Sequence, residues 1–236
     1  MNRRNFVKLL PLSIGAASAP SWAADGLPIF HVERFSDRLF VAADRVSDKS
    51  LSRATLQEAI HLASRRGLAL EFGEGVFRTR GFVIDAPLSV RGTPGRTIIK
   101  PMGQESFTID VRPQAGRERL SGVSLSGLTF SGGSLPHAMG VNPLERPIDT
   151  LPYAPERFNG LLTAWRVDGF SVSDCVFEGA PQAAVALWEC QGARISNNRI
   201  SLSRVAMFSH AGRDNVFFGN DCAESIEFGV YLAHFA

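Results

Sequence analysis

Similar segments recur in the second half of the chain, and this repeat limits the possible folds more than any other feature. Four segments align without internal gaps: 122–130, 169–177, 192–200 and 214–222. The last three begin at residues 169, 192 and 214, so the period is 22 to 23 residues. A fixed period of this length predicts a solenoid, in which each unit buries its apolar face only against its neighbours.

Within each repeat, β-branched and aromatic residues alternate with small polar residues around a turn at Asp174, Asn197 or Gly219. Alternation of this kind is typical of a strand with one buried face. We therefore predict an all-β fold, a right-handed parallel β-helix with an N-terminal capping α-helix. A leucine-rich repeat is the main alternative, but the chain lacks the Leu-x-x-Leu-x-Leu consensus of that fold.

The register of the repeat predicts which side chains stack in the core. One expected set is Val172, Phe177, Ile195, Ile200 and Phe217. A second strand follows in each repeat, and its predicted inward columns are Val185 with Phe208 and Val230, and Leu187 with His210 and Leu232. Asn198 and Asn220 share one position of the repeat, so we expect their amides to form a hydrogen-bonded ladder.

A single convincing helix is expected, between residues 52 and 67. One apolar face carries Leu56, Ala59, Ile60 and Ala63. Thr55, with Glu58 three residues later, has the spacing of a capping box. Gly67 then follows two arginines, which is a common way for a helix to end.

The N-terminus has the organisation of an export signal. Arg3 and Arg4 precede a short apolar run over 9–19, and a small-residue cleavage site follows at 21–23. We predict a twin-arginine signal peptide over 1–23 and a parallel β-helix domain over 24–236, in a periplasmic or secreted protein. An ordinary secretory signal with a chance arginine pair stays open. The apolar run is shorter than the ~20 residues that cross a bilayer, so no membrane span is expected after signal removal.

Several motifs resemble a known family. The segment 55–60, Thr-Leu-Gln-Glu-Ala-Ile, is followed by Leu-Ala-Leu-Glu-Phe over 68–72 and Gly-Glu-Gly-Val-Phe over 73–77. This order resembles the N-terminal cap and first coil of pectate-lyase-like β-helix proteins, with Gly73 and Phe77 in place of Pro and Tyr. Together with the arginine pair, the chain is similar to the family of twin-arginine-translocated uncharacterised repeat proteins. That resemblance implies a fold and an export route, but no activity.

An insertion at about 132–160 interrupts the repeat with prolines and gathers ionisable side chains. It contains Asp149, and it is either one wall of a binding groove or a solvated loop. The candidate catalytic residues are Asp149, Asp174, Glu178 and His210, because glycosidic chemistry needs two carboxyl groups ~5–10 Å apart. Asp174 is equally explained by its turn, and His210 by a place in the core.

Charge and cysteine content narrow the partners. Removal of the signal takes three of the 25 Lys+Arg and leaves 22 against 23 Asp+Glu, a balance that argues against nucleic-acid binding. Cys175, Cys190 and Cys222 have no nearby His/Cys cluster, so we expect free thiols and neither a metal nor a cofactor.

Two functions are left open by the sequence. The first is an exported β-helix repeat protein of glycan- or envelope-associated binding or structural role. The alternative is a polysaccharide lyase, glycoside hydrolase or epimerase that acts on an acidic polysaccharide. The repeat is still in progress at Ala236, so a C-terminal truncation is possible, and we expect self-association through the edge of the last coil.

Overall fold

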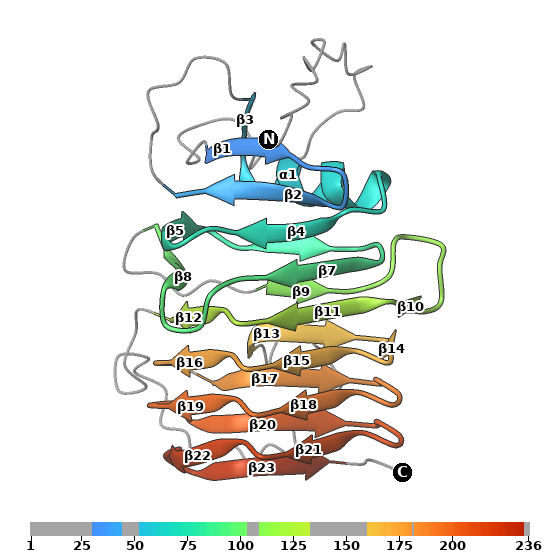
Figure 1. Ribbon diagram of the computed structural model, residues 1–236. Helices are drawn as coiled ribbons and strands as arrows, with labels where there is room; N and C mark the ends of the chain where they lie inside the picture. Colours follow the sequence, from blue (N-terminus) through green and yellow to red (C-terminus); the bar gives the residue numbers. More distant parts are fainter. Residues whose placement is uncertain (1–29, 44–51, 103–108, 133–159, 181, 234–236) are drawn as a thin grey trace.

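The computed structural model describes residues 30–43, 52–102, 109–132, 160–180 and 182–233. The predicted signal at 1–23 and most of the insertion, including Asp149, lie outside this part of the chain. Within it, three sheets run side by side and the chain visits them in turn, which is the predicted right-handed parallel β-helix. Figure 1 shows the coils stacked from the N-terminal end to the last coil.

The three sheets are named here A, B and C, in the order in which a coil passes through them. Sheet A holds β1 (Phe30–Arg34), β2 (Arg38–Ala42), β3 (Ser52–Ala54), β4 (Ala69–Phe72), β7 (Leu88–Arg91), β11 (Val123–Ser126), β15 (Ser171–Ser173), β18 (Arg194–Ser196) and β21 (Val216–Phe218). Sheet B holds β5 (Gly75–Thr79), β8 (Thr97–Pro101), β12 (Thr129–Ser131), β16 (Val176–Glu178), β19 (Arg199–Ser201) and β22 (Asp221–Glu224). Sheet C holds β6 (Phe82–Ile84), β9 (Ile109–Val111), β13 (Gly160–Trp165), β17 (Ala183–Trp188), β20 (Val205–His210) and β23 (Phe228–Ala233). A short parallel pair, β10 (Leu120–Ser121) and β14 (Val167–Asp168), lies between sheets C and A along the chain.

The predicted core columns of sheets A and B are confirmed. Val172, Ile195 and Phe217 are aligned across β15, β18 and β21, and Phe177 is aligned with Ile200 across β16 and β19. Four of these five side chains are at most 1% exposed. Phe217 is only partly buried, because no described strand follows the last coil on that side.

The turn between sheets A and B carries the predicted ladder. Asn198 is buried, and its Nδ2 donates a hydrogen bond to Asn220 Oδ1 at 2.9 Å. Its own Oδ1 accepts from the backbone N–H of Cys175 at 2.9 Å, so Cys175 is the preceding member of the column. The residue before each ladder position, Asp174 or Asn197, has a positive φ near 55°, which is the left-handed conformation that such residues tolerate.

The predicted register of sheet C was wrong by one residue in one coil. The observed columns are Val185 with Met207 and Val230, and Leu187 with Ser209 and Leu232. Phe208 and His210 therefore lie on the outer face of the sheet and not in the solenoid interior. Every residue of β17 and β20 is buried, so apolar residues occupy both faces and period-two alternation cannot tell them apart.

The predicted helix is α1 (Leu56–Arg65), which begins with the expected capping box between Thr55 and Glu58. It lies at the N-terminal end of the solenoid, near β1 and β2 (Figure 1). Gln57 bonds both backbone groups of Val83 in β6, at 2.8 and 3.0 Å, and so occupies the free edge of the first strand of sheet C. At the same end, β1 pairs antiparallel with β2 and β3, an addition to sheet A that the repeat did not predict. Within the described residues, no helix is long and apolar enough to cross a membrane.

Candidate functional site

The predicted catalytic residues do not converge. Asp174 lies exposed in the turn between β15 and β16, and Glu178 lies exposed at the end of β16 in sheet B. His210 lies at the end of β20 in sheet C and is buried. Asp149 is outside the described residues. These positions belong to different sheets and turns, so the structure offers no acid–base pair among the described candidates.

Sheet C instead presents aromatic side chains on its outer face. We call this set the aromatic face: Trp165, Trp188, Phe208, His210 and Tyr231. The pairing places Trp165, Trp188 and His210 in one column and Phe208 with Tyr231 in the next. The ring centroids of Trp188 and His210 are 4.9 Å apart, and those of Phe208 and Tyr231 are 5.8 Å apart and nearly parallel. The rings therefore pack against one another across successive coils.

The aromatic face is separate from the solenoid core. Leu187 and Met207 on the same strands point into the main core, whereas Trp188 and Phe208 pack together in a second cluster. Trp188, Phe208 and His210 are at most 5% exposed, so this second cluster is closed to solvent over most of its area. Only Trp165 and Tyr231 at its margins are partly exposed.

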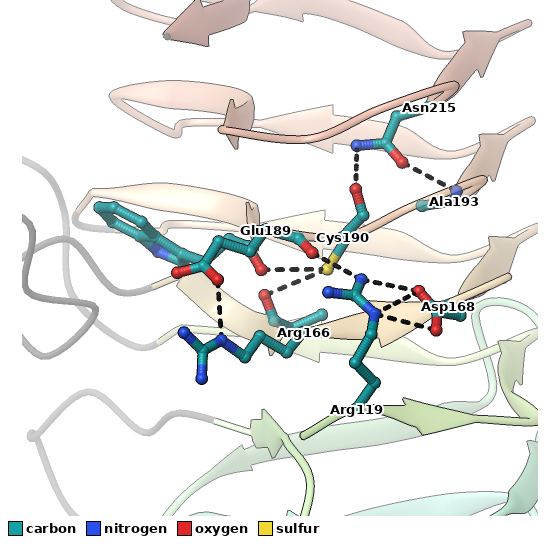
Figure 2. A network of polar contacts seen from close by, with 9 residues as sticks. Arg119, Arg166, Asp168, Glu189, Cys190, Ala193 and Asn215 are labelled. Atoms are coloured by element: carbon teal, nitrogen blue, oxygen red, sulfur yellow. Dashed lines mark hydrogen bonds and ion pairs between the residues drawn. The ribbon is translucent and has the colours of Figure 1, made fainter. Parts of the chain in front are cut away.

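A charged network borders the aromatic face where the strands of sheet C end (Figure 2). Arg166 lies over the ring of Trp165, with its guanidinium carbon 4.8 Å from the centroid, and its Nε is 2.7 Å from Glu189 Oε2. Arg119 Nε donates to both carboxylate oxygens of Asp168, at 2.8 and 2.9 Å. Its NH2 group also donates to the Glu189 carbonyl at 2.8 Å. The hydrogen bond with Asp168 raises the pKa of Arg119, so this network is charged and joins successive coils.

Two of the three cysteines, Cys175 and Cys190, are too buried to contribute a reactive group. Cys175, Cys190 and Cys222 are free thiols, as predicted. Burial raises the pKa of Cys190 to about 11 and that of Cys175 to about 12, so both stay as neutral thiols near pH 7. Among the residues that the structure describes, no group of three or more His, Cys, Asp or Glu side chains could hold a metal ion.

A second polar group lies at the N-terminal part of sheet C. Asp110 is the middle residue of β9, between the fully buried Ile109 and Val111, so its side chain points outward. A pocket borders this region and is lined by Asp85, Ala86, Pro87, Pro113, Gln114, Arg117, Arg119, Leu120 and Ser121. Arg119 thus belongs both to this pocket and to the network in Figure 2. The pocket, the charged network and the half-buried Trp165 beside it are therefore the candidate functional site.

The sequence analysis did not identify this site, although one signal was present. Trp165 and Trp188 are 23 residues apart in the chain, which is the repeat period, so they occupy equivalent positions. Asp110 carried no comparable signal, because β9 lies outside the four aligned segments.

Comparisons with known proteins add support for the fold. No family model and no curated protein matches the sequence. The structure is similar to that of a Parabacteroides merdae protein provisionally named a glycosyl hydrolase, with a TM-score of 0.50 and 11% identity over 76% of this chain and 88% of that one. It also matches the A-module of a mannuronan C-5 epimerase from Azotobacter vinelandii, with a TM-score of 0.37 and 18% identity over 70% of this chain and 51% of that one. At such low identity the first likeness is a likeness of fold, and that fold is the parallel β-helix.

Proposed function

We propose that the protein binds carbohydrate beside the ends of the strands of sheet C. The observation that carries this proposal is the half-buried ring of Trp165 beside the charged network, of which Arg119 also lines the pocket. A sugar ring presents patches of C–H groups, and these pack against the flat face of an aromatic side chain while the hydroxyl groups stay hydrated. Gln114, Arg117 and Ser121 in the pocket can bind those hydroxyl groups.

Polar groups at the strand ends can bind further hydroxyl or carboxylate groups of the ligand: the partly exposed Arg166 and Glu189 lie beside Trp165. A few placed polar groups beside an apolar surface are typical of a specific binding site. The likeness to a protein named as a glycosyl hydrolase supports the same class of ligand.

The test is a binding assay with one aromatic variant and one matched control. Purified protein is titrated calorimetrically with polygalacturonate, polymannuronate and neutral xylan. Trp165→Ala removes a half-buried ring of the aromatic face, and we expect a loss of ~0.5–1.5 kcal/mol in binding free energy. Phe218→Ala removes a ring that is 50% exposed in sheet A, and it should leave binding unchanged. Failure of the unmodified protein to bind any of these polymers would contradict the proposal.

We also propose that the chain reaches its ligand outside the cytoplasm, through the twin-arginine signal expected at 1–23. The arginine pair at Arg3 and Arg4 and the small residues at 21–23 support this route. The interpretation agrees with a near-neutral, glycan-binding solenoid, since envelope and secreted polymers are the accessible partners there. Cell fractionation of the precursor and of a variant with both arginines changed to lysine tests it.

A further inference from the structure

The outer face of sheet C is buried, although it points away from the solenoid core. Its side chains on β17 and β20 are at most 5% exposed: Ala183, Ala186 and Trp188 on the first strand, and Val205, Phe208 and His210 on the second. The outward side chains of β15 in sheet A, Ser171 and Ser173, are partly exposed. Neighbouring strands shield the flanks of an outward side chain but leave its outer end open. A further layer of atoms therefore covers the outer face of sheet C.

Within the part of the chain that the structure describes, no helix or strand supplies that layer. The buried cluster on this face is made of residues of sheet C alone. The strands β13, β17 and β20 make their extensive contacts with one another and with β9 and β23, which are their neighbours in the same sheet. The covering layer must come from elsewhere in the chain or from another molecule.

The connection between sheets B and C shows which part of the chain is available. In two later coils this corner takes only residues 179–182 and 202–204, whereas the connection from β12 to β13 takes 132–159. Both ends of this long connection are held at the corner. The N–H of Gly132 donates to the carbonyl of Glu178 at 2.7 Å, and Gly160 pairs with Ala183 as the first residue of β13. The extra length thus leaves and rejoins the solenoid beside sheet C.

The segment 133–159 is also long enough to cover the face. At up to ~3.3–3.6 Å per residue it is several times longer than any strand of sheet C, so it can cross the outer face and return. The segments 1–29 and 44–51 adjoin β1, β2 and β3 at the N-terminal end of sheet A, several coils from β17 and β20. The segment 103–108 is a short link towards β9, two strands before β17.

The composition of the segment suits a buried layer. Large apolar side chains are spread along it: Met139, Val141, Leu144, Ile148, Leu151 and Phe158. A segment that stays in solvent is usually poor in such side chains. Its prolines restrict the backbone in advance, so less conformational entropy is lost when the segment packs against the rings of sheet C.

We propose that residues 133–159 dock on the outer face of sheet C and form a second hydrophobic core with it. Trp188 and Phe208 are the central contacts of this core, and their ring centroids are 5.1 Å apart. Trp165 and Tyr231 lie at its margins, where they stay partly exposed. The docked segment therefore leaves only the margins of the aromatic face open to a ligand. This interaction is independent of whether the protein binds carbohydrate.

The test places a long charged side chain under the segment. Ala186 is fully buried on the outer face, with Thr163 and Phe208 as its register partners. The side chain of Ala186→Arg points away from the solenoid core, so it displaces only what lies over the face. Ser173→Arg is the matched control, because Ser173 points outward from sheet A and is partly exposed.

Limited trypsin digestion with mass spectrometry measures access to the peptide bond after Arg157. This bond should be cleaved slowly in the unmodified protein, at least about 10-fold faster in Ala186→Arg, and at the unmodified rate in Ser173→Arg. A second variant, Leu144→Asp with Ile148→Asp, changes the segment alone and leaves the solenoid intact. It should speed the cleavage to a similar extent, so the test does not depend on the folding of Ala186→Arg.

Fluorescence distinguishes the segment from a second copy of the chain. In the mature chain without 1–23, Trp165→Phe leaves Trp188 as the single tryptophan. Its quenching by acrylamide should be weak at every protein concentration, and should increase when Leu144→Asp and Ile148→Asp are added. Quenching that increases on dilution would identify a second copy as the covering layer and overturn the proposal. Rapid cleavage after Arg157 in the unmodified protein, or unchanged cleavage in the variant with both aspartates, would also overturn it.

Discussion

Replacement of Asn198 by alanine tests the ladder that joins successive coils. Asn198 is 1% exposed, and its side chain serves three partners at once. Oδ1 accepts from the N–H of Cys175 at 2.9 Å, and Nδ2 donates to the carbonyl of Val172 at 3.2 Å and to Asn220 Oδ1 at 2.9 Å. Alanine offers none of these bonds and leaves no opening for solvent at this depth.

The expected cost follows from the groups left without a partner. The backbone N–H of Cys175 and the carbonyl of Val172 both belong to residues that are at most 1% exposed. An unsatisfied buried polar group costs about 1–3 kcal/mol, so the two together predict a loss of about 2–6 kcal/mol in the free energy of unfolding. This is a large share of the 5–15 kcal/mol that is typical of a folded domain.

Asp221→Ala is the control, because it removes an exposed side chain of the same turn one coil later. Among the described residues, its Oδ1 accepts a hydrogen bond only from the N–H of the exposed Ala223 at 3.2 Å, so water can replace that bond. We expect a loss of about 0.5–1.5 kcal/mol at most, as for an ordinary solvent-accessible hydrogen bond. Urea unfolding followed by circular dichroism gives both values from the midpoint and slope. An Asn198→Ala protein no less stable than Asp221→Ala would refute the reasoning.

Three further outcomes are expected. Burial raises the pKa of Cys175 to about 12 and that of Cys190 to about 11, so iodoacetamide at pH 8 should label the half-buried Cys222 first. Mass spectrometry of the native protein measures the labelling of each cysteine, and equal labelling of all three would contradict this prediction. Changing Arg3 and Arg4 together to lysine should leave the precursor in the cytoplasm, whereas normal processing would indicate the ordinary secretory route. The last coil exposes six large apolar side chains, and the outer edges of its three strands have no described strand beside them. Light scattering across a dilution series should therefore detect self-association, and a monomer at every concentration would contradict this prediction.

The repeat alone was sufficient to predict the solenoid and two of its sheets. Ile195 and Phe217 recur at the same position of their coils, and a parallel strand pair can bury them only if equivalent positions stack. The ladder of Asn198 and Asn220 followed from the same spacing. The capping box of α1 was predictable too, because Thr55 and Glu58 interact within a single turn of chain. These are features whose partners are either local or fixed by one constant period.

In sheet C, apolar residues occupy both faces of a strand, so the sequence pattern is ambiguous. There the tertiary structure alone decided which residues face the core and which face outward. His210 was expected in the interior, and it lies on the outer face because the spacing from β17 to β20 is 22 residues and that from β20 to β23 is 23. A single residue of difference in a turn reverses every side chain of a strand. With apolar residues on both faces, the sequence contains no information to fix that difference.

The candidate site depended still more on the three-dimensional fold. Arg119 and Asp168 are 49 residues apart, which is not a multiple of the 22- to 23-residue period, yet their side chains share two hydrogen bonds. The sequence determined the stacking of this protein because stacking repeats, whereas its functional face depends on contacts that occur once, and the packed coils alone bring those residues together.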